Sequence, residues 1–176
     1  MITTETQAVP TGTWALDPVH STIGFAVGYM AGTFTAGFGD FDAVVKDGVL
    51  TGSAKVASIQ AKDPNLETHL QSPEFFDAER YPELAFESSA IERTGNRIRI
   101  DGEITIKGHT DPVEITGDIT DTIADPYGGE RFGLALAAVI RRDEFGVSWN
   151  TPLPSGEPAL SNDVTLIAEL QLVKQT

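Results

Sequence analysis

The fold class is decided by residues 97–107, which read RIRIDGEITIK. Isoleucines occupy one set of alternating positions, and charged side chains occupy the other set. Because successive side chains of a β-strand point to opposite faces of the sheet, this pattern predicts a strand with one buried face and one face in water. The buried face would carry Ile98, Ile100, Ile104 and Ile106, and the wet face Arg97, Arg99, Asp101, Glu103 and Lys107.

Alternation of the same kind recurs on both sides of this stretch. Near the carboxyl end, the apolar positions are Val164, Leu166, Ala168, Leu170 and Leu172, opposed by Thr165, Glu169 and Gln171. After Pro112, the apolar positions are Val113, Ile115, Ile119 and Ile123. Further strands are predicted near residues 13–29, 34–46, 49–59, 83–94 and 131–141, separated by turn signals such as Asp47-Gly48 and Gly95-Asn96.

About eight long strands of this kind predict an all-β antiparallel meander whose edges must be paired or covered. Closure into an eight-stranded β-barrel achieves this, although a sandwich or jelly roll would also explain the strand count. A barrel of about eight strands is either filled by its own side chains or able to hold one small ligand.

One insert interrupts the strands. Residues 65–86 read NLETHLQSPEFFDAERYPELAF and combine a helical pattern with several aromatic residues. Asp63 and Pro64 form a helix-start signal, with an N-cap aspartate before a proline at the first helical position. Ser72-Pro73 repeats the signal, so we expect two short turns of helix that direct Leu70, Phe75 and Phe76 inward.

Composition limits the function classes. The chain has 176 residues, which predicts one domain, and 12 Lys and Arg against 26 Asp and Glu give a net charge of -14. The negative electrostatic field of such a chain repels phosphate backbones, so nucleic acid is not an expected partner. With no cysteine, disulfides and thiolate chemistry are excluded.

The first residues contain neither a basic group nor an apolar run of signal length. We therefore expect residues 1–12 to form a flexible polar tail on a cytoplasmic protein, without stable membrane insertion. Residues 13–176 would form the barrel domain.

Several motifs of this chain resemble the YceI-like, or polyisoprenoid-binding, family. The motif residues are Trp14, Leu16-Asp17-Pro18, His20-Ser21, Leu66, His69-Leu70, Ser72, Phe75-Phe76-Asp77, Tyr81-Pro82, Phe86, Ser88, Ile104, Ile106, Gly108, Arg142, Phe145-Gly146 and Trp149. The resemblance implies a lipocalin-like barrel with a short helical insert, whose elongated apolar cavity holds an isoprenoid or acyl chain without catalysis.

We assign the candidate ligand-binding residues to the inward faces of the strands, to the insert and to the motif formed by Arg142, Phe145-Gly146 and Trp149, called the late motif below. They are Phe25, Val27, Tyr29, His69, Leu70, Phe75, Phe76, Phe86, Ile104, Ile106, Leu136, Ile140, Arg142, Phe145 and Trp149. The alternative is that the apolar residues among these candidates simply fill a solid core. Many small residues on the strands favour a cavity, because large inward side chains are needed to fill the interior of a barrel. The Phe75-Phe76 pair would be either a gate at the mouth or a fixed plug.

Polar candidates give weaker signals. Arg142 either seats a head group or, as we favour in so acidic a chain, bridges to a carboxylate and fixes a turn. His69 would anchor the insert by a hydrogen bond or touch a head group. Asp17, His20 and Ser21 include the residue types of a catalytic triad, but adjacent residues of a strand point to opposite faces, so we expect hydrogen bonds to the backbone instead. The three histidines show no metal-ligand spacing.

The preferred prediction is a non-enzymatic protein that needs no cofactor or metal and sequesters or carries an isoprenoid or other long-chain amphiphile. A homodimer is possible, since a long polyprenyl chain would outrun one barrel. The alternative is a ligand-free structural or stress-associated barrel that acts through a protein partner. A hydrolase or isomerase acting on the same apolar compounds is the third hypothesis.

Overall fold

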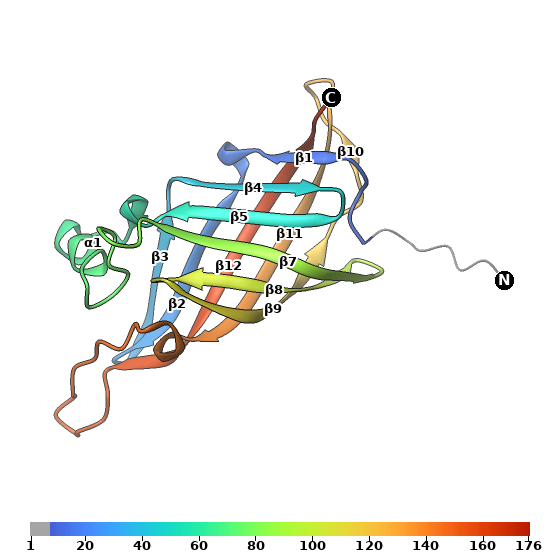
Figure 1. Cartoon of the computed structure of the whole chain (residues 1–176). Coiled ribbons are helices and arrows are strands. Elements are labelled where there is room, and N and C mark those ends of the chain that lie inside the picture. Colours follow the sequence, from blue (N-terminus) through green and yellow to red (C-terminus); the bar gives the residue numbers. More distant parts are fainter. Residues whose placement is uncertain (1–7) are drawn as a thin grey trace.

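Eight antiparallel strands pair into a closed ring in the computed structural model, which describes residues 8–176 (Figure 1). Each strand of the ring pairs with the next, and the last pairs with the first. The predicted eight-stranded antiparallel barrel is thereby confirmed. In order around the ring the strands are β12 (Leu160–Lys174), β1 (Thr13–Leu16), β4 (Phe41–Lys46), β5 (Val49–Lys55), β7 (Glu83–Thr94), β8 (Arg97–Ile106), β9 (His109–Ile119) and β11 (Glu130–Arg141).

Three of the predicted strands are interrupted rather than continuous. The predicted strand 49–59 divides into β5, a 3-10 turn at Val56–Ser58 and the two-residue strand β6 (Ile59–Gln60). The predicted strand 13–29 breaks into β1 and β2 (Thr22–Tyr29) at a single 3-10 turn, Pro18–His20, whose N-cap Asp17 accepts hydrogen bonds from the next backbone N–H groups. Both pieces pair with the long strand β12. The predicted strand 34–46 likewise divides into β3 (Gly32–Phe38) and β4. The bend after β1 changes the pairing partners, because β1 pairs with β12 and β4 whereas β2 pairs with β12 and β3.

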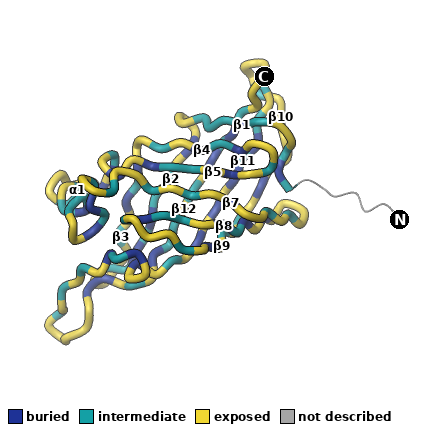
Figure 2. Tube along the Cα trace, viewed as in Figure 1, coloured by how far each residue is buried: buried dark blue, intermediate teal, exposed yellow. Residues whose placement is uncertain are grey.

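Burial follows the predicted alternation (Figure 2). In β8, Ile98, Ile100 and Ile106 are buried and the intervening arginines are exposed. One position departs from the prediction: Ile123 is 57% exposed, because it lies in the two-residue strand β10 (Ile123–Ala124), which pairs only with the start of β11.

The predicted insert lies between β6 (Ile59–Gln60) and β7, beyond one end of the strands, and begins with helix α1 (Pro64–Leu70). Asp63 caps α1 by accepting hydrogen bonds from the N–H groups of Asn65 and Leu66. The second predicted helical turn is wrong. The Ser72 hydroxyl donates to the carbonyl of His69 instead of capping a new helix, and hydrogen-bonded turns follow.

The opposite end of the barrel is packed shut. Trp14 and Phe132 meet edge to face there, with ring centroids 5.0 Å apart, and both are almost fully buried. Val9 is 2% exposed and joins the same cluster. Residues 1–7 of the predicted tail lie outside the described residues, but the part that contains Val9 packs onto the barrel. Within the described range, no helix is long and apolar enough to cross a membrane.

Candidate ligand-binding cavity

The barrel encloses an apolar cavity of about 470 Å³, which is lined by members of both hydrophobic clusters and by the insert. Its volume falls within the range of small-molecule sites. Trp14 and Phe132 of the packed end do not line this cavity, whereas Leu70, Phe75 and Phe76 of the insert do, so we place its mouth on the side of the insert. The barrel is therefore closed at one end and hollow towards the other.

Every residue predicted to bind ligand lines this cavity. Whether each contacts a ligand stays a prediction. These predicted residues come from four strands, the insert and the segment after β11: Phe25, Val27, Tyr29, Phe86, Ile104, Ile106, Leu136 and Ile140 from the strands, His69, Leu70, Phe75 and Phe76 from the insert, and Arg142, Phe145 and Trp149 from the segment after β11.

Sequence reasoning missed several lining residues. Phe34 and Phe38 alternate along β3 and line the cavity, and the same period-2 signal that identified Phe25 would have found them. Phe25 lies at the centre of this aromatic group, with its ring centroid 6.2 Å from those of Phe34 and Phe38 and 5.9 Å from that of Phe76. The insert is thus fastened to the wall by aromatic contacts.

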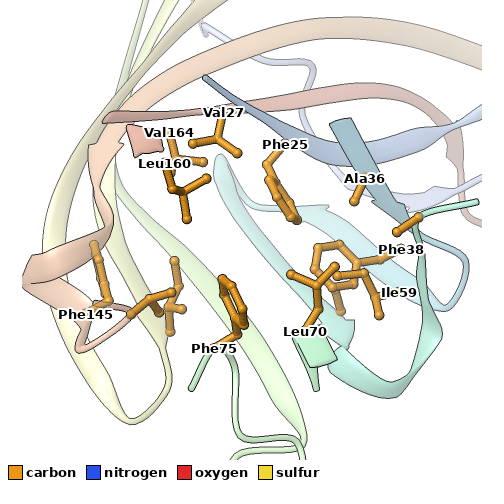
Figure 3. Close-up of a cluster of buried hydrophobic side chains, with 14 residues drawn as sticks. Phe25, Val27, Ala36, Phe38, Ile59, Leu70, Phe75, Phe145, Leu160 and Val164 are labelled. Atoms are coloured by element: carbon orange, nitrogen blue, oxygen red, sulfur yellow. The ribbon is translucent and has the colours of Figure 1, made fainter. Parts of the chain in front are cut away.

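Figure 3 shows the insert residues Leu70 and Phe75 projecting into the same interior space as Phe25 and Val164 of the wall. Phe75 is 7% exposed, while Phe76 is partly buried. A side chain buried to that degree contributes about 1.5–3 kcal/mol to the closed arrangement. The insert is therefore a packed lid rather than a loose loop.

His69 joins the lid to the segment that follows β11. Its ring packs edge to face on Phe75 and on Trp149, with centroids 4.9 Å and 5.3 Å away. Its Nε2 atom lies 2.6 Å from a carboxylate oxygen of Glu74, and this bond stays within the insert. The hydrogen bond of His69 thus holds the insert together, and its aromatic contact with Trp149 reaches the segment after β11.

Lys107 ties the same two segments to the barrel. Lys107 lies in the turn between β8 and β9, and its ammonium donates to the carbonyl of Pro73, 2.6 Å away, and to that of Gly146, 3.0 Å away. One cation thus bonds the lid and the later segment at once. Charge-assisted bonds of this type are stronger than neutral ones of the same exposure, so Lys107 provides a polar attachment of the lid to the barrel.

Arg142 holds the late motif by a different contact from the one we favoured. The prediction of a carboxylate partner is wrong: its guanidinium donates to the backbone carbonyls of Ser161, Val147, Trp149 and Leu160, at 2.8–3.3 Å. The residue is 7% exposed, and burial lowers the pKa of its guanidinium. Most of its donors are already used, which favours the structural role over a head-group seat.

Space remains beside the wall because several inward positions are small. Ala138 of β11 is buried and lines the cavity, yet it belongs to neither of the two packed hydrophobic clusters. Its cross-strand partner Leu166 also lines the cavity. Small inward residues of this kind leave volume that the lumen side chains do not fill.

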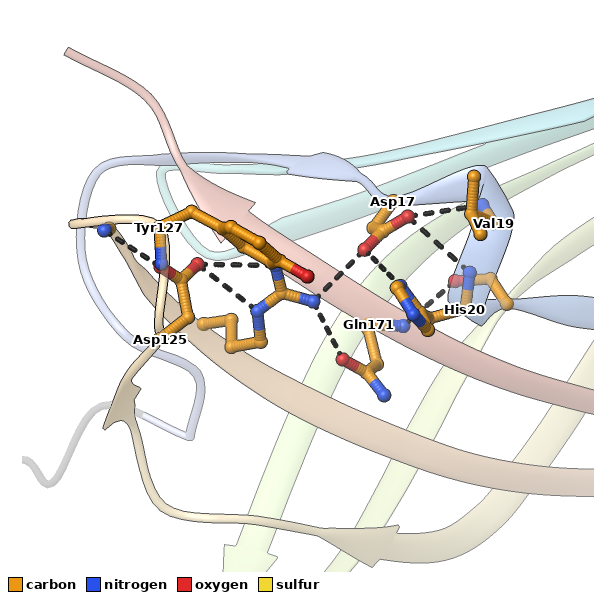
Figure 4. Close-up of polar contacts among 9 residues, drawn as sticks. Asp17, Val19, His20, Asp125, Tyr127 and Gln171 are labelled. Atoms are coloured by element: carbon orange, nitrogen blue, oxygen red, sulfur yellow. Dashed lines mark hydrogen bonds and ion pairs between the residues drawn. The ribbon is translucent and has the colours of Figure 1, made fainter.

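The triad-like residues Asp17, His20 and Ser21 do not line the cavity, and Figure 4 shows Asp17 and His20 in a polar network with Asp125 and Gln171. His20 Nδ1 lies 2.7 Å from Asp17, and Arg131 donates to the same carboxylate at 2.9 Å. The bond from His20, assisted by Arg131, lowers the pKa of Asp17 to about 2. The buried Ser21 hydroxyl instead accepts from the N–H of Gln171, so His20 and Ser21 have different partners. This network fastens the 3-10 turn to β11 and β12.

The described residues contain no group of three or more histidine or acidic side chains positioned to hold a metal ion. Together, the apolar lining, the lid and the closed far end suit a ligand that is mostly hydrocarbon.

Comparison with known proteins agrees with this geometry. A curated relative, a UPF0312 protein of Photorhabdus laumondii, is 28% identical over 134 residues, covering 72% of this chain and 70% of the relative. BcnA of Burkholderia cenocepacia has a crystal structure that superposes with a TM-score of 0.72 at 21% identity, covering 91% of this chain and 99% of BcnA. A polyisoprenoid binding domain from Saccharophagus degradans, implicated in plant cell wall breakdown, superposes with a TM-score of 0.67 at 11% identity, covering 92% and 98%.

These two solved structures share the fold of this chain. The profile of the YceI-like domain matches residues 14–172, which span β1 to β12. The chain therefore belongs to the YceI-like domain family.

Proposed function

We propose that this protein binds one amphiphile with a long apolar tail, an isoprenoid or an acyl chain, and sequesters or carries it without chemical change. The observation that supports this most is the cavity itself: a space of about 470 Å³, lined almost wholly by hydrocarbon and aromatic side chains, beneath a packed lid. The polyisoprenoid binding domain with the same fold supports the choice of ligand class.

The size of the cavity sets the size of the tail. Taking the roughly 30 Å³ of a water molecule in the liquid as a stand-in for a methylene group, the cavity admits about 15 such groups. Burial of each methylene is worth about 0.8 kcal/mol, so a tail of this length gives a gross gain of about 12 kcal/mol before the cost of association. A tail alone can therefore support useful affinity, and a longer chain would protrude from the mouth.

Three features of the site support binding rather than catalysis. The acidic and basic groups that resemble a triad lie outside the cavity and serve the packed end. Arg142 is held by backbone carbonyls, and His69 is held by Glu74 and two aromatic rings. These groups already have structural partners. The cytoplasmic location expected from the sequence stays a prediction.

Native mass spectrometry of protein purified without detergent, combined with mass spectrometry of its organic extract, tests the proposal. We expect one prenyl or acyl compound per barrel. A clean mass of the bare chain, unchanged after incubation with farnesol or with a long-chain fatty acid, would refute the proposal and favour the alternative of a solid barrel that acts through a protein partner.

A further inference from the structure

The cavity ends at a definite depth inside the barrel. In β8, Ile104 lines it, whereas Ile100, which is nearer the packed end, does not. In β12, Leu170 lines it and Leu172 does not. The inward side chains just beyond this depth are sealed, since the exposed fraction is 0% for Ile100 and Leu172 and 3% for Leu134. We call the deepest lining layer the floor, and it includes Ala43, Phe86, Leu136 and Leu170.

Phe86 of β7 has the largest side chain among these floor residues, and it covers a gap in the neighbouring strand. A Cβ atom added to Gly102 of β8 would lie 2.7 Å and 2.9 Å from Cζ and Cε1 of the Phe86 ring. The ring therefore occupies the space that a side chain at Gly102 would fill, between the cavity residue Ile104 and the sealed Ile100. Phe86 also packs against the cluster at the packed end. Its ring thus separates the cavity from the packed end along β8.

The wall beside Phe86 is made of small residues. Gly52 of β5 is its cross-strand neighbour, and Ala43 of β4 is in turn the neighbour of Gly52. Both of these residues line the cavity. Because neither has a large side chain, the residue at position 86 decides how deep the space reaches on this side of the barrel.

The polarity of the lining sets the direction of a bound amphiphile. All four floor residues have hydrocarbon or aromatic side chains, whereas His69 and Arg142 line the cavity from the insert and the late motif. A polar head at the floor would lose its water without gaining a hydrogen-bond partner. The tail therefore enters first, and its methyl end rests on the floor.

We propose that Phe86 is the length gauge of the site, which means that its ring sets how many tail carbons the barrel accepts. This inference rests on the proposed function, because it needs a tail in the cavity. The cavity volume puts the limit near 15 methylene-sized groups, which corresponds to an acyl chain of about 16 carbons or to about three isoprene units. Below the limit each added methylene raises affinity about fourfold, and carbons beyond it stay at the mouth and add little.

Displacement of cis-parinaric acid by saturated fatty acids from decanoic to docosanoic acid, kept monomeric with cyclodextrin, tests the proposal. The affinity of the wild type should rise with chain length and level off near palmitic acid. Phe86→Ala removes about seven carbon atoms from the floor, so the levelling-off point should move to about 20 carbons. Arachidic acid should then bind this variant at least about 100-fold more tightly than palmitic acid does.

Two further variants separate depth from general packing. Ala43→Leu adds about three carbon atoms to the floor and should move the levelling-off point down by about three carbons. Phe34→Ala makes the same truncation as Phe86→Ala, but at a half-buried lining position of β3 outside the packed-end cluster. It should weaken binding of every acid without moving the point. A point that stays in place in Phe86→Ala and Ala43→Leu, or that moves equally in Phe34→Ala, would overturn the proposal.

The wild type gives a readout that needs no variant, so the proposal stays testable if a floor variant fails to fold. Palmitic acid with a diazirine near its methyl end, photolysed in the complex, should crosslink to the floor strands β4, β7, β11 and β12. Crosslinks confined to the insert would overturn the proposal while leaving the proposed function intact. Failure of every acid to bind the wild type would refute the proposed function and the length gauge with it.

Discussion

Replacement of Ala138 by leucine separates a ligand cavity from a solid core. The substitution adds three carbon atoms at a buried position of β11 that lines the cavity and has no place in either packed cluster. If those carbons occupy space that a tail would use, about three methylenes of tail are excluded. At about 0.8 kcal/mol each, the loss is about 2.4 kcal/mol, or roughly 60-fold in affinity.

The free energy of unfolding should move differently from affinity. The added leucine side chain would fill existing space, so the ligand-free protein keeps or slightly gains stability, whereas overpacking a solid core costs about 1–3 kcal/mol. Fluorescence titration with cis-parinaric acid measures affinity, and urea unfolding of ligand-free protein measures stability. Ala135→Leu, at an exposed position of the same strand, is the control and should change neither quantity. A destabilised Ala138→Leu variant with unchanged affinity would refute the reasoning.

Three further predictions concern the lid, the barrel wall and the 3-10 turn that Asp17 caps. Lys107→Met removes the charge-assisted bonds from the barrel to the lid and to the segment after β11. If this lowers the free energy that holds the lid closed by about 1.5 kcal/mol, cis-parinaric acid should be released about tenfold faster in stopped flow. An unchanged release rate would exclude Lys107 as a restraint on the lid. Gly117→Ala places a Cβ atom 1.9 Å from a backbone oxygen of β11 and should lower the free energy of unfolding by at least about 1–3 kcal/mol, whereas Gly133→Ala, with its nearest atom at 3.5 Å, should be tolerated. Because the bond from His20 lowers the pKa of Asp17 from 3.8 to about 2, Asp17 stabilises the fold above about pH 4 and this contribution is lost as the pH falls towards 2; urea unfolding across that range should show a shallower pH dependence for Asp17→Asn.

The strands could be predicted because their signal is local. Alternation such as that of Ile98 and Ile100 fixes which face of each strand is buried, and eight such segments with short turns leave few arrangements other than closure. The cavity lining follows from the same alternation once the barrel closes, which is why inward residues such as Phe25 and Leu136 could be chosen in advance. Capping chemistry located the start of α1 at Asp63 for the same local reason.

The errors fall where contacts join distant segments. The sequence around Arg142 does not show that the carbonyl of Ser161 will lie 2.8 Å from its guanidinium. Every residue has a backbone carbonyl, so no residue type identifies such a partner. Ser72-Pro73 resembles a helix start, but the packing of Phe75 beneath the barrel rim favours turns over a second helix. Ile123 continues the alternation of Val113, Ile115 and Ile119. It lies in β10, which is not part of the closed ring of strands, so its side chain is exposed rather than buried.

The packed cluster around Trp14 and Phe132 has a consequence for how a ligand can enter and leave the barrel. Under the proposed function, a barrel packed shut at one end cannot serve as a conduit, so a ligand that enters tail first must leave through the same mouth. Uptake and release would then use one opening in turn, and a second ligand could enter only after the first has left.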